Sequence, residues 1–169
     1  LSLTSLQAPS PVLWMNFQGQ ILVNGEEFNP TFNPGASRYR SERGVCYSFS
    51  GGKGGILFGD TQALALQGSI SVAAWINPKA WVTDGPGAQI LFRGDDRNGL
   101  VPYYLTIHPD GTVNFAINDE QQQGMSVKTE LQLGKWQHIL ASFDAKTGIM
   151  RMWLNGEEVA NTITTRRPF

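Results

Sequence analysis

The fold of this chain is decided by residues 136–160, which read WQHILASFDAKTGIMRMWLNGEEVA. Apolar and polar residues alternate twice within this stretch, and a period of two is typical of strands that bury one face. A turn sequence at residues 144–148 separates the first run from the second, and Asn155-Gly156 separates the second from a third. Asn-Gly supplies the positive φ angles of a type I′ turn. The stretch therefore predicts three antiparallel strands joined by two tight turns.

The alternation also assigns side chains to the two faces of these strands. We expect the buried face to carry Ile139, Ala141, Phe143, Met150, Met152 and Leu154. The opposite face is expected to carry Gln137, Leu140, Ser142, Arg151 and Trp153.

Further strand patterns precede this stretch, and no segment has a helical period, so the class is all-β. We predict strands at residues 12–17, 44–49, 56–58, 69–77, 89–93, 102–108, 112–118 and 125–128. Apolar residues on both faces of the strand at 69–77 favour a central position in its sheet. Residues 18–44 are expected to form a long turn-rich connection with at most one short strand, and residues 61–66 a helical turn. Residues 1–11 read as a linker, and residues 12–169 as one domain.

Composition excludes several classes of protein. The 169 residues carry a net charge of −1, so no basic surface for nucleic acid is expected. No apolar run has the length of a membrane span, so we expect no direct membrane insertion. The amino terminus lacks the pattern of an intact signal peptide. The single cysteine, Cys46, forms no internal disulfide and is expected to be a buried structural thiol.

Two short motifs carry little weight. A phosphate-binding P-loop has a Ser or Thr directly after its lysine and a helix after the loop. The glycine-rich loop at residues 51–55 contains Lys53, but no Ser or Thr follows that lysine, and the next predicted element is a strand. Arg93-Gly94-Asp95 spells an integrin-recognition tripeptide, but so short a string can arise by chance, and Arg93 is expected to end a strand.

The strand pattern of residues 12–160 resembles the laminin-G-like (LamG/pentraxin type) family of concanavalin A-like domains. The matching features are Trp136 with His138, Phe143-Asp144, Thr147-Gly148 and residues 154–157, with residues 45–51, 56–60 and 69–78 upstream. The resemblance implies an antiparallel jelly-roll β-sandwich. Family members usually continue for two more strands. Either the sequence is cut before them, or the missing strands come from elsewhere, or this member closes its sandwich differently. Lectins, adhesion modules and enzymes share the fold, so function must be argued from a site.

The carboxylates do not favour an enzyme. Glycoside hydrolases of this fold usually place them at alternate positions of one strand, as in Glu-x-Asp-x-x-Glu, and no such run is present. The acidic pairs here are adjacent in sequence, and adjacent side chains diverge on a strand. Cys/His metal spacing is absent too. Calcium is common in the family, and Asp60, Asp95 and Asp96 would be its candidate ligands, so Ca²⁺ is a possible cofactor and no other is expected.

A glycan site needs aromatic faces and planar polar groups on loops of a rigid scaffold. The candidate residues are Trp81, Asp95, Asp96, Arg97, Asn98, Tyr103, Tyr104, Asn118 and Glu120. Three of these groups lie at the ends of strands that follow one another, so we expect them to gather on one rim. Either Tyr103 or Tyr104 must face the core. The other tryptophans, Trp14, Trp75, Trp136 and Trp153, are expected in the core or on a sheet face.

These features together predict a non-catalytic recognition module. The resemblance implies a glycan as its ligand, within a larger exported or membrane-anchored protein and therefore in an extracellular or periplasmic location. The alternative is a protein–protein adhesion or sensor domain without a sugar site. Long loops rich in aromatic and amide side chains favour the first function, and a large flat apolar patch would favour the second.

Overall fold

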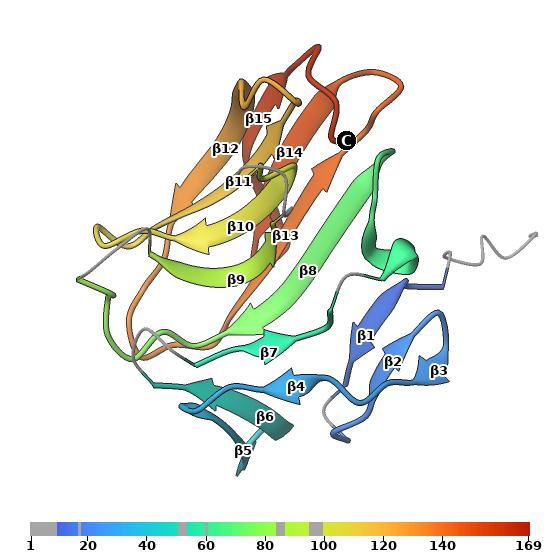
Figure 1. The fold of residues 1–169 in the computed structure, drawn as a ribbon. Helices are drawn as coiled ribbons and strands as arrows, with labels where there is room; N and C mark the ends of the chain where they lie inside the picture. Colours follow the sequence, from blue (N-terminus) through green and yellow to red (C-terminus); the bar gives the residue numbers. More distant parts are fainter. Residues whose placement is uncertain (1–9, 17, 51–53, 60, 84–86, 95–99) are drawn as a thin grey trace, which may run out of the picture. The chain divides into compact units, whose positions relative to one another are not determined.

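The computed structural model describes residues 10–16, 18–50, 54–59, 61–83, 87–94 and 100–169, which form an antiparallel all-β structure with a short 3-10 turn at Gln62–Leu64 (Figure 1). The chain divides into two compact units, an amino-terminal unit of Leu1–Ala65 and a carboxy-terminal unit of Leu66–Phe169. The all-β class and the helical turn at 61–66 are confirmed. The linker at residues 1–11 and the single domain over residues 12–169 stay predictions.

The carboxy-terminal unit is a sandwich of two antiparallel four-stranded sheets that lie face to face (Figure 1). The first sheet has the order β12-β11-β10-β9 and consists of β9 (Ala88–Arg93), β10 (Tyr103–Ile107), β11 (Thr112–Asn118) and β12 (Gly124–Glu130). The second has the order β15-β14-β13-β8 and consists of β8 (Ile70–Ile76), β13 (Gln137–Phe143), β14 (Ile149–Leu154) and β15 (Glu157–Ile163).

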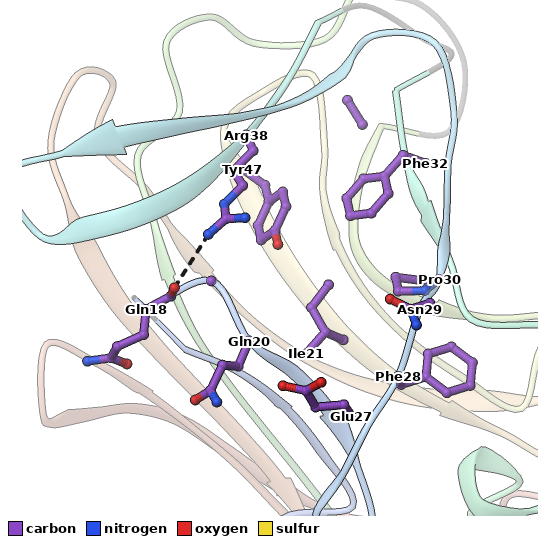
Figure 2. Close-up of a pocket in the computed structure, with 12 residues that line it drawn as sticks. Gln18, Gln20, Ile21, Glu27, Phe28, Asn29, Pro30, Phe32, Arg38 and Tyr47 are labelled. Carbon is purple, nitrogen blue, oxygen red and sulfur yellow. Dashed lines mark hydrogen bonds between the residues drawn. The ribbon is translucent and has the colours of Figure 1, made fainter.

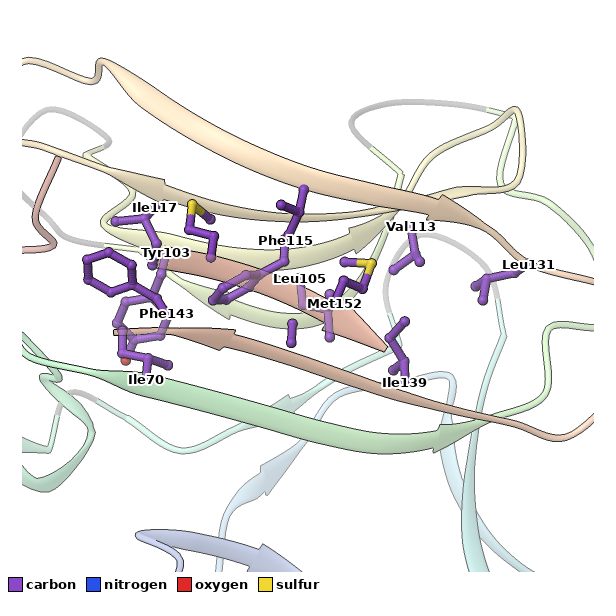
Figure 3. Close-up of a cluster of buried hydrophobic side chains, with 13 residues drawn as sticks. Ile70, Tyr103, Leu105, Val113, Phe115, Ile117, Leu131, Ile139, Phe143 and Met152 are labelled. Carbon is purple, nitrogen blue, oxygen red and sulfur yellow. The ribbon is translucent and has the colours of Figure 1, made fainter. Parts of the chain in front are cut away.

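The core lies between these two sheets (Figure 3). Its buried members are Ile70, Tyr103, Leu105, Val113, Phe115, Ile117, Val127, Leu131, Ile139, Ala141, Phe143, Met150 and Met152. They occupy alternate positions of their strands, because successive side chains of a strand point to opposite faces. Fully burying a large apolar side chain contributes about 1.5–3 kcal/mol, so this core is the main source of stability in the unit.

The decisive stretch folds as its pattern predicts. Strand β13 pairs with β14, and β14 pairs with β15, both antiparallel. The first turn is closed by the Gly148 N–H, which donates to the Asp144 carbonyl at 2.7 Å. At the second turn, Asn155 and Gly156 have φ angles of 53° and 92°, which are those of a type I′ turn.

Two expectations for this unit are wrong. Gln137 lies on the buried face with Ile139, because the two are separated by two positions of one strand, and its side chain is only 4% exposed. Strand β8 is the outermost strand of its sheet in the described part of the chain, not a central one. Its second face, which carries Ser71, Ala73 and Trp75, is exposed, so apolar residues on both faces did not mark burial on both faces.

The amino-terminal unit contains three small antiparallel sheets. The first has the order β1-β2-β3, with β1 (Leu13–Met15), β2 (Ile21–Val23) and β3 (Glu26–Glu27). The second pairs β4 (Thr31–Phe32) with β7 (Ile56–Leu57), and the third pairs β5 (Ala36–Ser41) with β6 (Gly44–Phe49). The strands expected at 12–17, 44–49 and 56–58 are therefore present.

The expectation that residues 18–44 form mainly a connection is wrong, since four short strands lie within them. The sequence does contain a turn signal for these strands. Asn24-Gly25 joins β2 to β3 with φ angles of 51° and 84°, another type I′ turn. The strands it joins are only three and two residues long, too short for an alternating pattern to be recognised.

Cys46 is buried on β6, as expected, and its Sγ lies 3.0 Å from the Ser41 Oγ. In the described residues, no helix has the length and apolar character needed to cross a membrane.

Candidate functional site

Phe92 and Tyr104 are paired neighbours across β9 and β10, on the face of the β9–β12 sheet that points away from the core. Leu105 on β10 faces the core, so Tyr104 beside it faces outward. Phe92 is a large apolar side chain near the end of the edge strand β9, and it is 51% exposed. Its ring lies against Gly94, where an added Cβ would be 2.6 Å from the Phe92 Cε1. The missing side chain at Gly94 lets this ring lie along the backbone.

The same row of the sheet continues with small residues. Tyr104 pairs with Ala116 on β11, and Ala116 pairs with Ser126 on β12. Ala116 is buried, Tyr104 is half-buried and Ser126 is exposed, so the polar side chain at the far end of this row is open to solvent. We refer to Phe92, Tyr104, Ala116, Ser126 and the neighbouring Asn118 as the outer face.

Asn118 stands at the end of β11 and connects two segments of the chain. Its Nδ2 donates to the Val101 carbonyl at 2.7 Å, and the Val101 N–H donates to the Gln122 Oε1 at 3.1 Å. The segment that enters β10 is therefore attached to the β11–β12 turn. This attachment holds Asn118 close to the aromatic pair.

The β11–β12 turn is also attached to the carboxy-terminal segment. Arg166 donates to the Asp119 carboxylate and, at 2.7 Å, to the Gln123 Oε1. Burial by itself would raise the pKa of Asp119, but the Gln123 N–H and the Arg166 guanidinium outweigh it and hold that pKa below its ordinary value. Asp119 is therefore ionised at neutral pH and keeps the turn in place.

The sequence-predicted site residues divide into three groups. Tyr104, Asn118 and Glu120 lie at the same end of the β9–β12 sheet, as expected for a rim, and Glu120 is exposed in the β11–β12 turn. Asp95, Asp96, Arg97 and Asn98 lie outside the described residues. Two further residues, Tyr103 and Trp81, lie elsewhere.

Tyr103 is a core residue with 3% of its surface exposed, and this burial raises the pKa of its hydroxyl. Of the two tyrosines, it is the one that faces the core. Trp81 lies at the opposite end of the sheet from Asn118. It packs against the core and against Gly111 in the β10–β11 turn, where an added Cβ would be 2.9 Å from the Trp81 Cζ2. Its physical role is to cover the end of the core, so it does not join the rim.

Sequence reasoning missed Phe92. The strand at 89–93 was predicted, but its faces were not assigned. The β-bulge opposite Leu105 and Thr106 puts both Ile90 and Leu91 against the core, which breaks the simple alternation in this strand. The register with Tyr104 is what identifies Phe92 as outward-facing.

The amino-terminal unit contains a pocket of about 480 Å³ (Figure 2). It is lined by Gln18, Gly19, Gln20, Ile21, Glu27, Phe28, Asn29, Pro30, Phe32, Ala36, Arg38 and Tyr47. The Phe32 and Tyr47 rings stack with centroids 5.6 Å apart and planes at 24°. Sequence reasoning missed this pocket too, because its lining comes from five short strands and their turns within residues 18–47.

No metal site is evident in the part of the chain that the structure describes, where no group of three or more His, Cys, Asp or Glu side chains comes together. The calcium candidates Asp60, Asp95 and Asp96 lie outside that part. Calcium binding therefore stays a prediction from the resemblance.

Comparison with known proteins identifies the family. Residues 50–169, more than half of the chain, match the family model described as Concanavalin A-like lectin/glucanases superfamily. The chain belongs to this family, as the strand pattern indicated. Among curated proteins, it is similar to the pentraxin-related protein PTX3 of mouse and of human, with 27% identity to each. The match covers 56% of this chain and 23% of each relative, so it spans about a quarter of their length.

Solved structures show the same fold at lower identity. The binding domain of Paraclostridial Mosquitocidal Protein 1 matches with a TM-score of 0.65 and 13% identity, over 90% of this chain and 39% of that one. The binding domain of botulinum neurotoxin serotype D matches with a TM-score of 0.64 and 13% identity, over 91% of this chain and 39% of that one. Domain 4 of AbnA, an extracellular arabinanase of Geobacillus stearothermophilus in complex with arabinotriose, matches with a TM-score of 0.55 and 18% identity. This match covers 86% of this chain and 64% of that one. At these identities the likeness shows a β-sandwich fold of the lectin-like binding-domain type, and nothing of the ligand.

Proposed function

We propose that this chain is a non-catalytic recognition module that binds a glycan on the outer face of the β9–β12 sheet. The observation that carries the proposal is the exposed Phe92, held beside Tyr104 by the strand register. Ligand sites are lined mainly by apolar and aromatic side chains with a few polar groups beside them, which is the composition of this part of the sheet. A sugar ring presents C–H groups on one face, which pack on aromatic rings.

The polar groups at the same end of the sheet suit the hydroxyl groups of a sugar. The Asn118 Oδ1, the Ser126 hydroxyl and the Glu120 carboxylate can accept hydrogen bonds, and the Tyr104 and Ser126 hydroxyls can also donate them. Asn118 is already held by its bond to the Val101 carbonyl, so little side-chain entropy is lost when it binds. Residues 95–98 follow β9 in the sequence and remain proposed members of the rim.

The proposal also states that the chain is not catalytic and that its parent protein is exported. The adjacent acids Glu26-Glu27 and Glu157-Glu158 lie in strands, where neighbouring side chains point apart, and Glu158 forms an ion pair with Arg151 at 3.8 Å. This supports a non-catalytic role. We further propose that the chain belongs to a larger exported protein, since members of the family to which it belongs act mainly outside the cytoplasm.

The first test is a glycan array probed with the purified chain, once with calcium and once with a chelator. Glycans bound on the array are then titrated against Phe92→Ala and Tyr104→Ala variants. The matched control is Phe49→Ala on β6, which removes an aromatic ring of similar exposure, 53%, from outside the outer face.

We expect the two outer-face variants to lose at least tenfold in affinity and Phe49→Ala to bind as the parent does. Each variant is checked for an unchanged melting temperature, since an exposed side chain contributes little to stability. Equal loss in all three variants would contradict the outer face as the site. No binding to any glycan by a folded chain would favour the protein–protein adhesion module instead.

A further inference from the structure

A second ligand site is indicated by Arg38, which lines the pocket of the amino-terminal unit. Its Nη2 donates to the Gln18 carbonyl at 3.4 Å, a long hydrogen bond (Figure 2). In the part of the chain that the structure describes, no carboxylate forms an ion pair with it. A guanidinium has five N–H donors in a planar fork, so most of them remain available to a ligand in the pocket.

Gly19 makes the position of this guanidinium possible. An added Cβ at Gly19 would be 2.0 Å from the Arg38 Nη2, so the guanidinium occupies the space where a side chain would begin. The φ angle of Gly19 is +87°, which other residues rarely adopt. The charged end of Arg38 therefore packs against the backbone of Gly19, in the turn between β1 and β2, and this contact holds it at the pocket.

An aromatic surface lies directly beside the charge. Arg38 on β5 pairs with Tyr47 on β6, so the guanidinium and the phenol ring are neighbours on the same face of the hairpin. The Tyr47 ring stacks on Phe32, which is itself exposed. A ligand bound to Arg38 would lie against this aromatic pair.

The remaining lining mixes apolar side chains with polar ones, and it carries one negative charge, that of Glu27. Figure 2 shows Glu27 near Ile21 and Phe28, apart from Arg38. A carboxylate at that place accepts hydrogen bonds from hydroxyl groups and repels a second negative charge. The pocket therefore suits a ligand with one anionic group at one end and hydroxyl groups at the other.

We propose that this pocket binds a carboxylate-bearing sugar, of the uronic acid class. Its carboxylate would accept two hydrogen bonds from Arg38, the pairing for which a guanidinium fork is best shaped. Its ring would lie on Tyr47 and Phe32, and its hydroxyl groups would face Glu27 and Asn29. The volume of about 480 Å³ lies within the range of small-molecule sites. This site does not depend on the outer face, since all of its residues belong to the other unit.

The test compares two ligands that differ only at C6, where one carries a carboxylate and the other a neutral hydroxymethyl group. Methyl β-glucuronide and methyl β-glucoside are titrated into the full chain, followed by amide chemical shifts or by calorimetry. An oligouronide in a third arm distinguishes a glycan chain from a free sugar acid as the source of the carboxylate. We expect the glucuronide to bind at least tenfold more tightly than the glucoside.

Variants assign the preference to Arg38. Arg38→Ala is expected to abolish the preference for the glucuronide, and Arg38→Lys, which keeps the charge without the fork, to lose most of it. The matched control is Arg40→Ala, two positions along β5, which removes an exposed arginine that does not line the pocket. Its preference should equal that of the parent chain.

Equal affinity of the parent for the two sugars, or equal loss in Arg38→Ala and Arg40→Ala, would overturn the proposal. A change in melting temperature identifies a variant that has lost its fold. In that case Tyr47→Leu, which removes the sugar-facing ring but keeps apolar volume, provides the second measurement. A Phe92→Ala variant should keep the preference, so failure of the outer face and failure of this pocket are told apart.

Discussion

The buried side chain of Gln137 bonds to both backbone groups of Gln132. Its Oε1 accepts from the Gln132 N–H at 3.0 Å, and its Nε2 donates to the Gln132 carbonyl at 2.8 Å. The amide thus replaces a neighbouring strand for the segment that leads into β13. A buried amide is tolerated here because its hydrogen bonds are made.

Replacing this amide should destabilise the carboxy-terminal unit. Gln137→Leu would leave the Gln132 N–H and carbonyl without their partners, and a buried group in that state costs about 1–3 kcal/mol. Urea unfolding followed by tryptophan fluorescence measures the change. Gln132→Leu is the control, since it keeps both backbone groups and removes only an exposed side chain that contacts Lys135. Similar losses in the two variants would mean that the paired hydrogen bonds contribute little.

Gly148 cannot carry a side chain. Its φ angle is +76°, and an added Cβ would be 2.1 Å from the Thr164 carbonyl oxygen, a backbone atom. We expect Gly148→Ala to cost about 2–4 kcal/mol, from left-handed backbone strain and from displacement of the segment around Thr164. Gly156→Ala isolates the first of these effects, because Gly156 has a φ of +92° and no atom within 4 Å of its added Cβ. Thermal unfolding should place Gly148→Ala below Gly156→Ala, and the reverse order would contradict the collision.

Asp144 should make stability depend on pH. The Thr147 hydroxyl, which donates to it at 2.7 Å, and the Lys146 N–H hold the pKa of this carboxyl below its ordinary value. A lowered folded-state pKa adds stability above the unfolded-state value, and that stability is lost as pH falls through the folded-state value. Asp144→Asn should therefore lower the melting temperature at pH 7, and the difference should shrink as pH falls below about 4, the unfolded value. Glu120→Gln in the exposed β11–β12 turn serves as the control, and a difference for Asp144→Asn that did not change with pH would contradict this assignment.

Gly19 should control ligand binding rather than stability alone. We expect Gly19→Ala to displace Arg38 and lower the affinity for methyl β-glucuronide at least fivefold. Gly25→Ala carries similar backbone strain, at a φ of +84°, but its added Cβ contacts nothing within 4 Å. Both variants should lose about 1–2 kcal/mol of stability, the cost of a left-handed residue with a side chain. If Gly25→Ala weakened glucuronide binding as much as Gly19→Ala does, the contact between Gly19 and Arg38 would not be the cause of the weaker binding.

Part of this structure was predictable from local pattern. The strands of residues 136–160 alternate over six or seven residues and end at turn sequences, so their faces and turns follow from the sequence. Three of the strands within residues 18–44 escaped prediction because strands of two or three residues show no period, although Asn24-Gly25 marked one of their turns. The fourth, β5, has six residues, but polar side chains dominate it and leave no apolar alternation to recognise. Of the proposed site residues, Tyr104, Asn118 and Glu120 lie at one end of the sheet, and their role in binding stays a prediction. Trp81 does not lie there, and the sequence could not show this, because the packing of its ring on Gly111 is a long-range contact.

The sequence by itself determined the all-β class, the sandwich family and the hairpins of the carboxy-terminal unit, because periodicity and turn chemistry are local properties. Only the tertiary structure decided which aromatic residues face outward and which charges line a pocket. Phe92 was placed beside Tyr104 by a register that contains a β-bulge, and Arg38 was placed over Gly19 by the meeting of two separate hairpins. Both relations join residues far apart in the chain, and the energy that fixes them comes from packing and pairing that no local pattern contains.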